Sequence, residues 1–208
     1  MEQFLQNTLQ NSQDAFQKWR KIPFEERQKY FTQLSEILND RKQDFATIIT
    51  QEMNKPISQS VSEIEKCAAL CDYYATAKNI LKTEQVETEF QISEIHHEPL
   101  GVILGVMPWN FPFWQAIRFA VPTILAGNVI VLKHASICEK SGETMQEIFE
   151  KAGFPKGIFT FLKVSHTEVE EMIAHPIIRG VSLTGSEAAG RKIAETAGKN
   201  LKKCVLEL

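Results

Sequence analysis

The segment best suited to chemistry is Met-Pro-Trp-Asn-Phe-Pro at 107–112, in which an amide side chain stands between two prolines. It follows the apolar run 101–106, so it lies where a buried strand ends and a helix begins. In an open α/β sheet, the carboxyl ends of the strands form the ligand crevice. A rigidly held amide at Asn110 can stabilise charge that develops on a carbonyl oxygen. An Asn that only satisfies loop carbonyls is the alternative.

Two charged residues belong to other apolar runs. Lys133 directly follows Val-Ile-Val-Leu, and a Lys at the end of a parallel strand can reach ribose hydroxyls or phosphate. Glu207 interrupts the run Val-Leu-Glu-Leu, where an apolar setting raises the pKa of a carboxyl and suits it to act as a base near neutral pH. The alternatives are a lone surface lysine and an outward-facing glutamate on an edge strand.

The stretch Leu-Thr-Gly-Ser at 183–186 combines a strand end, a turn and the start of a helix. Unpaired N–H groups and the positive end of the helix dipole bind phosphate oxygens, and Ser186 adds a hydroxyl. The pattern is not G-x-G-x-x-G, so the usual dinucleotide fingerprint is missing. An ordinary capped helix is an equally good interpretation.

The cysteines and the histidine pair do not predict a metal site. Four cysteines at positions 67, 71, 138 and 204 have no His beside them at ligand spacing, which is typical of buried thiols in a reducing compartment. His96 and His97 are neighbours on an extended segment, and adjacent residues on a strand point to opposite faces.

Helices are expected to dominate the first part of the chain. Apolar residues from Tyr30 to Met53 recur at three- and four-residue steps and predict one long helix. Asn54 can take the left-handed conformation at its end, and Pro56 cannot continue it. A second helix is predicted over 57–81 and a third around residues 4–19, whereas alternation over 86–92 predicts a half-exposed strand.

From residue 100 onward, the sequence pattern changes and predicts strands that alternate with helices. Apolar runs at 101–106, 129–132, 158–164 and 177–183 indicate strands buried on both faces, with helical patterns at 141–152, 167–175 and 186–197 between them. This alternation predicts a doubly wound parallel α/β sheet. A last apolar strand runs into residue 208, which is expected to be a cut through a domain and not a natural terminus.

Composition limits the class of protein. The 208 residues, 43% apolar and 24% charged, suit one domain or one and a half. A net charge of −3 argues against nucleic acid or an anionic membrane as the main partner. The sequence contains no signal peptide pattern and no long apolar span, so a soluble cytoplasmic protein is expected.

In this order, the motifs resemble the aldehyde dehydrogenase family, from the helix before Glu52-Met-Asn-Lys-Pro to the last residue. The matching landmarks are His97-Glu-Pro-Leu-Gly, Pro108-Trp-Asn-Phe-Pro, Ala126-Gly-Asn-Val-Ile-Val-Leu-Lys, Ala152-Gly-Phe-Pro, Leu183-Thr-Gly-Ser and Leu206-Glu-Leu. Within the family, the sequence motifs are most similar to those of the succinate-semialdehyde dehydrogenases. The resemblance implies a Rossmann-like sheet, an aldehyde substrate and NAD or NADP as cofactor.

The resemblance also implies roles for single residues. Asn110 would be the oxyanion-hole amide, Glu207 the general base and Arg118 the group that binds the distal carboxylate of the substrate. Lys133 would bind the adenosine ribose, and Gly185 and Ser186 the pyrophosphate. The complete set of cofactor contacts would be Trp109, Lys133, Ser136, Gly185 and Ser186, with no metal.

Several positions depart from the family pattern. Ser136 replaces a Glu that many NAD-preferring members use to bind the ribose, which leaves room for the 2′-phosphate of NADP. His134 stands where Pro is common, and Asn54 where Gly usually ends the helix. None of the four cysteines stands in the context of the family's nucleophile, which lies beyond Glu207.

The resemblance therefore implies an incomplete enzyme. Residues 1–82 would be the helical part of the cofactor-binding domain, 83–99 a strand segment of an oligomerisation arm, and 100–208 the sheet and its helices, with the catalytic domain absent. The first hypothesis is the N-terminal portion of an NAD(P)-dependent aldehyde dehydrogenase, inactive by itself. The alternative is a split-gene or degraded product that binds nucleotide or assembles with a separate C-terminal chain. The full-length form would be a homo-oligomer.

Overall fold

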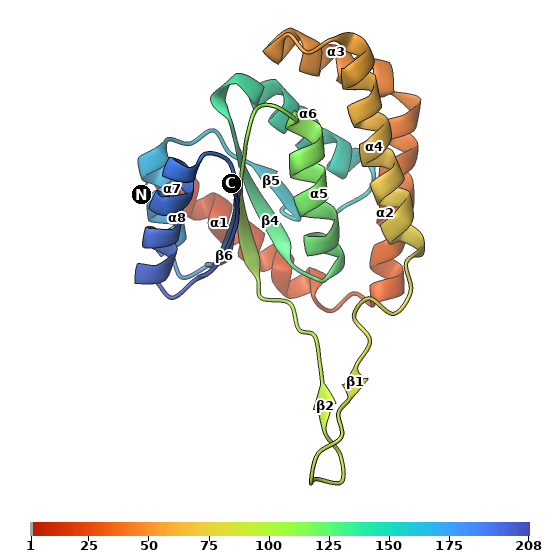
Figure 1. Cartoon of the computed structure of the whole chain (residues 1–208), viewed down its shortest axis with the longest axis vertical. Coiled ribbons are helices and arrows are strands. Elements are labelled where there is room, and N and C mark those ends of the chain that lie inside the picture. The colour runs from red at the N-terminus through yellow and green to blue at the C-terminus, as the bar shows by residue number, and fades with distance from the viewer. Residues whose placement is uncertain (1) are drawn as a thin grey trace.

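A five-stranded parallel sheet organises the chain, seen in a computed structural model that describes residues 2–208 (Figure 1). Its strands, in the order β5-β4-β3-β6-β7, are β3 (Val102–Met107), β4 (Val129–His134), β5 (Phe159–Phe161), β6 (Ile178–Thr184) and β7 (Lys203–Glu207). All four strand pairs are parallel. The chain builds outward from β3 in one direction and then, from β6, in the other, so the predicted doubly wound α/β fold is confirmed.

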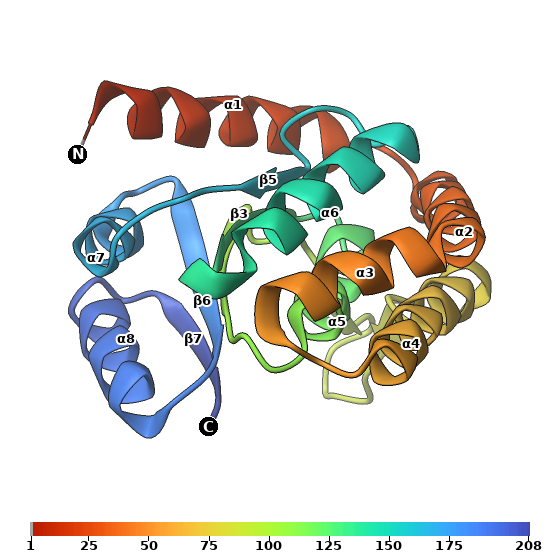
Figure 2. The same cartoon turned by 90° about the horizontal axis from the view of Figure 1, so that it is seen from above.

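Helices cover both faces of the sheet. α5 (Pro112–Leu125) and α6 (Glu139–Lys151) pack on one face, with α2 (Phe24–Asp40), α3 (Lys42–Met53) and α4 (Ile57–Thr76) outside them (Figure 2). α1 (Gln3–Trp19), α7 (His166–Ala174) and α8 (Glu187–Lys199) lie on the opposite face. A short 3-10 helix, Ser136–Cys138, joins β4 to α6. No helix within residues 2–208 has the length and apolar character to span a bilayer.

The two central strands are buried on both faces, as their unbroken apolar runs predict. Every residue of β4 is buried, and only Val106 of β3 is partly exposed. Gly105 allows α5 to approach the sheet, because a Cβ there would lie 2.5 Å from the ring of Phe119. Leu104, Val131 and Ile117 belong to the same buried core.

The long helix predicted from Tyr30 to Met53 is wrong in one respect, because it is two helices. α2 ends at Asp40 and α3 begins at Lys42, with Arg41 outside the helical region at φ −112° and ψ 22°. The residues from Asn39 to Asp44 are all polar, so no apolar side chain holds a continuous helix to the core there. Asn54 ends α3 in the left-handed conformation with φ 57°, as predicted. α4 ends at Thr76, earlier than expected.

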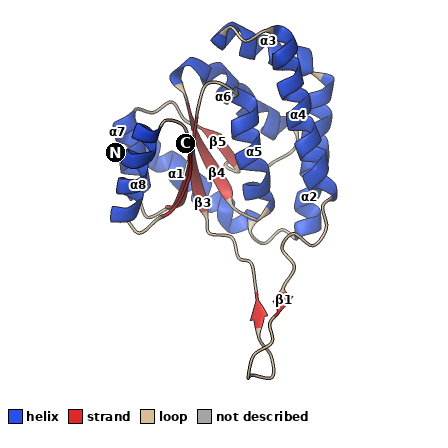
Figure 3. Ribbon diagram, in the orientation of Figure 1, coloured by secondary structure: helices blue, strands red, loops and turns tan. Residues whose placement is uncertain are grey.

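A hairpin arm projects from the body between α4 and β3. β1 (Glu84–Gln85) pairs antiparallel with β2 (Glu94–Ile95), and most of the arm is loop (Figure 3). The strand predicted over 86–92 is therefore wrong, because these residues form the tip of the hairpin. The apolar side chains at the tip stay largely uncovered by the described part of the chain: Phe90 is 71% exposed and Ile92 is 74% exposed.

Smaller differences concern helix starts and the last strand. α6 begins at Glu139 instead of Ser141. α7 begins at His166, one residue before the predicted pattern, and is capped by Ser165, whose side chain forms a reciprocal capping box with Glu168. Ser186 caps α8 as expected. β7 is an exposed edge strand with one neighbour, so the expectation of a buried final strand is wrong.

Candidate functional site

The carboxyl ends of β3, β4, β6 and β7 meet along one edge of the sheet. Met107 pairs with His134, and Thr184 pairs with Glu207, so the four strands end at matching levels. The strand order reverses between β3 and β6, the point at which doubly wound sheets open a ligand crevice. The positions expected at strand ends for Asn110, Lys133 and Ser186 are observed at this edge, and Glu207 ends β7 at the same edge.

A cavity of about 450 Å³ lies between α5 and the adjacent face of β6 and β7. Its lining includes Gln115 and Arg118 from α5 and Thr184 and Glu207 from the sheet edge. The Arg118 guanidinium forms an ion pair with the Glu207 carboxylate and donates a hydrogen bond of 2.8 Å to Gln115 Oε1. Thr184 Oγ1 donates to the same Glu207 oxygen at 3.2 Å. Two residues expected to have different roles therefore contact each other.

The apolar setting expected around Glu207 is absent. Its side chain is 51% exposed, and a guanidinium and a hydroxyl contact its carboxylate. The reason is the position of β7 at the edge of the sheet, where alternation places Val205 and Glu207 on the face that borders the cavity. The negative charge of Glu207 is compensated by the guanidinium of Arg118 and is not destabilised by burial in the way that the sequence analysis had expected.

Lys133 is a buried cation without a hydrogen-bonding partner. Only 8% of the residue is exposed, and its ammonium makes no hydrogen bond or ion pair with residues 2–208. Desolvation lowers the pKa of Lys133, and the charge of Glu139 partly opposes this effect. Ser136 is exposed at the start of the 3-10 helix that follows β4. An ammonium without a partner, three residues before a neutral hydroxyl, fits an oxygen-rich or anionic ligand.

The turn after β6 offers fewer donors than its sequence suggests. The backbone N–H of Gly185 donates to the carbonyl of Glu207 at 3.0 Å, so β7 already occupies it. Ser186 Oγ accepts from the N–H of Ala189 at 3.3 Å and caps α8. The Ser186 hydroxyl proton and the first N–H groups of α8, which have no intrahelical acceptor, are left for an anion.

The loop between β3 and α5 leaves the amide of Asn110 free. Asn110 is exposed, and its side chain makes no hydrogen bond with any other described residue. Other groups bond the loop carbonyls: Cys138 Sγ approaches the Trp109 oxygen at 3.6 Å, and His134 Nε2 lies 2.9 Å from the Pro112 oxygen. The alternative role for Asn110, satisfying loop carbonyls, is therefore not observed.

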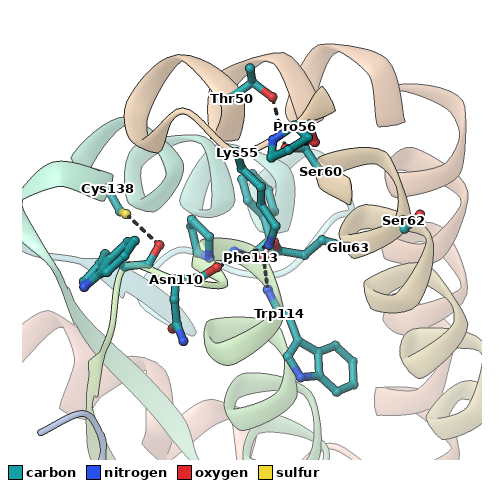
Figure 4. A network of polar contacts seen from close by, with 12 residues as sticks. Thr50, Lys55, Pro56, Ser60, Ser62, Glu63, Asn110, Phe113, Trp114 and Cys138 are labelled. Carbon is teal, nitrogen blue, oxygen red and sulfur yellow. Dashed lines mark hydrogen bonds and ion pairs between the residues drawn. The ribbon is translucent and has the colours of Figure 1, made fainter. Parts of the chain in front are cut away.

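Three residues near this loop were missed or given no role in the sequence analysis, and Figure 4 shows two of them, Lys55 and Glu63. Lys55 Nζ donates to the Asn110 carbonyl at 3.2 Å and to Glu63 at 2.5 Å. Glu63 accepts from the N–H groups that open α5. One signal was available, since Glu63 is an acid next to Ile64 on the apolar face of α4. His134, buried behind the loop, accepts from the Ala135 N–H at Nδ1 and so carries its proton on Nε2.

No cysteine of the described chain has the properties of a nucleophile. Cys67, Cys71 and Cys138 are buried, and Cys204 is partly buried. Burial raises the pKa of each thiol, that of Cys138 to about 12. These thiols are therefore protonated at neutral pH, whereas the reactive species is the thiolate.

Comparison with known proteins places this geometry in a family. Residues 2–208 match the aldehyde dehydrogenase family. The succinate semialdehyde dehydrogenase Sad of Escherichia coli, named as NAD(P)+-dependent, is 42% identical over 205 residues, which cover 98% of this chain and 44% of Sad. A succinate-semialdehyde dehydrogenase of Deinococcus radiodurans, named as NADP(+)-dependent, is 37% identical over 201 residues, covering 96% of this chain and 42% of the relative.

A solved structure agrees over the whole fold. The succinic semialdehyde dehydrogenase of Streptococcus pyogenes, in complex with NADP+ as the cofactor, superposes with a TM-score of 0.97 at 40% identity, covering 100% of this chain and 46% of that protein. The chain belongs to the aldehyde dehydrogenase family. It spans less than half the length of these relatives and corresponds to their N-terminal portion.

Proposed function

We propose that this chain is the cofactor-binding portion of an NADP-preferring aldehyde dehydrogenase that oxidises succinate semialdehyde to its carboxylic acid. The observation that carries the proposal is the pair of unsatisfied donors at one edge of the sheet. Lys133 presents an ammonium at the tip of a largely buried side chain and Asn110 an amide, and neither group has a hydrogen-bonding partner in the described chain. The names of the relatives support this choice of substrate and cofactor.

The residues around Lys133 fit a phosphorylated nucleotide. Lys133 would bind the adenosine ribose, and Ser136, which brings no negative charge, would leave the 2′-phosphate unopposed. Ser186 and the first turn of α8 would receive the pyrophosphate, while Trp109, 55% exposed, would border the cofactor. When bound, NADP+ supplies the acceptor for the hydride that leaves the substrate.

Arg118 and Glu207 would act in sequence on the substrate side. A guanidinium binds a carboxylate bidentately, so the distal carboxylate of succinate semialdehyde can compete with Glu207 for Arg118. Glu207, released from the ion pair, is then available to take a proton from water. Asn110 would donate its amide N–H to the carbonyl oxygen as negative charge develops there.

The nucleophile has to come from outside residues 2–208, because their cysteines are protonated and buried or partly buried. We therefore expect the purified chain to bind NADP+ without oxidising succinate semialdehyde. Turnover of that aldehyde by the chain alone would contradict the missing nucleophile.

Calorimetric titration with NADP+ tests the cofactor proposal directly. The wild-type chain should bind NADP+, and Lys133→Met should weaken binding at least about tenfold, since hydrogen bonds to charged groups contribute roughly 1.5–3 kcal/mol. Lys163→Met, an exposed lysine with ion pairs to Glu139 and Glu143, is the matched control and should leave affinity unchanged. Equal affinity of all three proteins would refute the role of Lys133.

A further inference from the structure

We propose that Lys55 and Glu63 are positioning residues, and that their buried ion pair sets the orientation of the 108–111 loop and so of the Asn110 amide. The importance of that orientation for catalysis rests on the proposed function. The contacts themselves are independent of it. Neither residue belongs to the cavity beside Arg118 and Glu207 or to the candidate cofactor contacts.

Glu63 holds the start of α5. Only 1% of its side chain is exposed, and its Oε1 accepts from the N–H groups of Phe113 and Trp114, both at 2.9 Å (Figure 4). Pro112, the first residue of α5, has no N–H, and no side chain of the preceding residue caps this helix. The carboxylate therefore supplies the missing cap from a different helix and lies at the positive end of the α5 dipole.

Lys55 connects this cap to the loop. Its side chain is 6% exposed, and its ammonium contacts the other Glu63 oxygen at 2.5 Å and the Asn110 carbonyl at 3.2 Å. It also lies 3.7 Å from the centre of the Phe111 ring, on which it makes a cation–π contact. An ammonium has three donors and no acceptor, so it can hold the Asn110 peptide through its carbonyl only. The amide side chain of the same residue is left free to face the crevice.

Stabilising the helix pair does not by itself explain a buried charge pair. A buried ion pair pays for desolvation and is often no more stabilising than apolar side chains of the same size. Lys42 and Glu65 form a second ion pair between α3 and α4, at 2.6 Å, with side chains 38% and 47% exposed, and this pair does not contact the loop. Lys55 and Glu63 differ from that pair in what else they contact: Lys55 bonds the carbonyl of Asn110 itself, and Glu63 bonds the N–H groups that open the helix after the loop.

The test compares variants of the 208-residue chain by NMR. We measure amide hydrogen exchange at Phe113 and Trp114, and backbone and side-chain order at Asn110, in the wild type, Lys55→Met, Glu63→Gln and the charge swap Lys55→Glu with Glu63→Lys. Lys42→Met is the matched control for losing a lysine that pairs with α4. Ile64→Val, a buried change on the same helix, controls for general destabilisation.

We expect Glu63→Gln to speed exchange at Phe113 and Trp114 at least about tenfold, and Lys55→Met to lower the order of Asn110, with both controls at wild-type values. The charge swap should not restore order, because it places an ammonium against N–H groups and a carboxylate against a carbonyl. Restoration by the swap, or loop order in Lys55→Met equal to that in Ile64→Val, would overturn the proposal. If Lys55→Met does not fold, the amide exchange rates of Glu63→Gln and the Asn110 order in the charge swap test the proposal instead.

Titration of the same variants with NADP+ separates this inference from the proposed function. Failure of the wild-type chain to bind NADP+ rejects the proposed function and leaves the positioning pair standing on its NMR result. Normal NADP+ binding together with an unchanged loop rejects the positioning pair alone.

Discussion

Single residues set the charge along the carboxyl edge of the sheet. Lys133 brings an ammonium without a partner there, and Ser136 adds an exposed hydroxyl at the start of the next helix. On the substrate side, Arg118 and Glu207 neutralise each other in an ion pair. The edge is therefore positive where we propose a phosphate and neutral where we propose an aldehyde.

Substitution of Ser136 should change the choice of nucleotide. Ser136→Glu places a carboxylate near Lys133, where it would repel a 2′-phosphate and accept hydrogen bonds from ribose hydroxyls. We expect NADP+ affinity to fall at least about tenfold, worth roughly 1.4 kcal/mol, while NAD+ affinity holds or rises. Calorimetric titration with both nucleotides measures this, and Ser136→Gln controls for size. An equal loss of affinity for NADP+ and NAD+ would count against a role of Ser136 in the choice between the two nucleotides.

His134 should make stability depend on pH. Burial, with a smaller effect of the Lys133 charge, lowers the pKa of His134 from 6.5 to about 4, although its hydrogen bond to Pro112 opposes the change. Between pH 6.5 and pH 4, His134 therefore binds a proton in the unfolded chain but stays neutral in the folded chain. The free energy of unfolding should thus fall as pH decreases from 6.5 to 4, by up to about 3 kcal/mol from this residue.

Urea unfolding across pH 7 to 4 measures the effect, with His134→Gln as the comparison. Gln keeps an N–H donor for the Pro112 carbonyl and cannot titrate, so its pH dependence should be smaller than that of the wild type. His166, for which no structural role is found, provides the control variant His166→Gln. Equal pH slopes in wild type and His134→Gln would show that His134 titrates normally.

At the scale of elements, two glutamates cap helices to which they do not belong. Glu63 of α4 caps α5, and Glu52 of α3 caps α6, accepting from the N–H of Lys140 at 2.6 Å and of Ser141 at 3.1 Å, and from the Ser141 hydroxyl. α5 follows the loop that carries Asn110, and α6 follows β4, which carries Lys133, and the short helix that begins at Ser136. The outer helices therefore position the inner ones through charge as well as through packing.

Removal of the second cap should destabilise the fold locally. Glu52→Ala leaves two backbone N–H groups of α6 without an acceptor, and we expect a loss of about 1–2 kcal/mol in the free energy of unfolding. Glu147→Ala, an exposed acid within α6, should cost less than about 0.5 kcal/mol. Urea unfolding compares the two. Equal losses would mean that the Glu52 contacts contribute no more than a surface ion pair.

At the scale of the whole molecule, the arm and the body differ in how they cover their apolar side chains. The body has one continuous apolar core, whereas the arm exposes Val86, Phe90 and Ile92. Adjacent exposed apolar side chains on a projecting hairpin are typical of a surface that another chain covers. The predicted oligomerisation arm remains a prediction.

Deletion of the arm should therefore separate assembly from folding. Replacing residues 84–95 by a short Gly-Ser turn should leave the free energy of unfolding within about 1 kcal/mol of the wild type, because the tip packs on no part of the body. The same deletion should convert any oligomer that the wild-type chain forms into monomers. Analytical ultracentrifugation measures the mass, and Glu87→Gln, a neutralised arm residue, is the control. An oligomer that survives the deletion would place the interface elsewhere.

Periodicity and turn residues predicted most of the elements from the sequence. The runs that became β3 and β4, the left-handed end of α3 at Asn54 and the Ser186 cap of α8 all depend on neighbours within a few residues. The break at Arg41 and the loop at 86–92 were missed, because apolar spacing there continues without an indication of what covers it. The carboxyl edge as the site also followed, since parallel strands end together.

Other features exist only in three dimensions. Lys55 reaches the Asn110 carbonyl across 55 residues of chain, and Glu63 reaches the start of α5 across 50. Arg118 meets Glu207 across 89 residues, and β7 loses its burial because it lies at an edge. Local sequence determines backbone conformation and which side chains avoid water. Which charges meet, and which donors stay unpaired, depends on packing between distant segments. The sequence by itself determined the family, the sheet and the edge at which the candidate residues lie, whereas the tertiary structure alone decided how that edge is held and which of its groups are free.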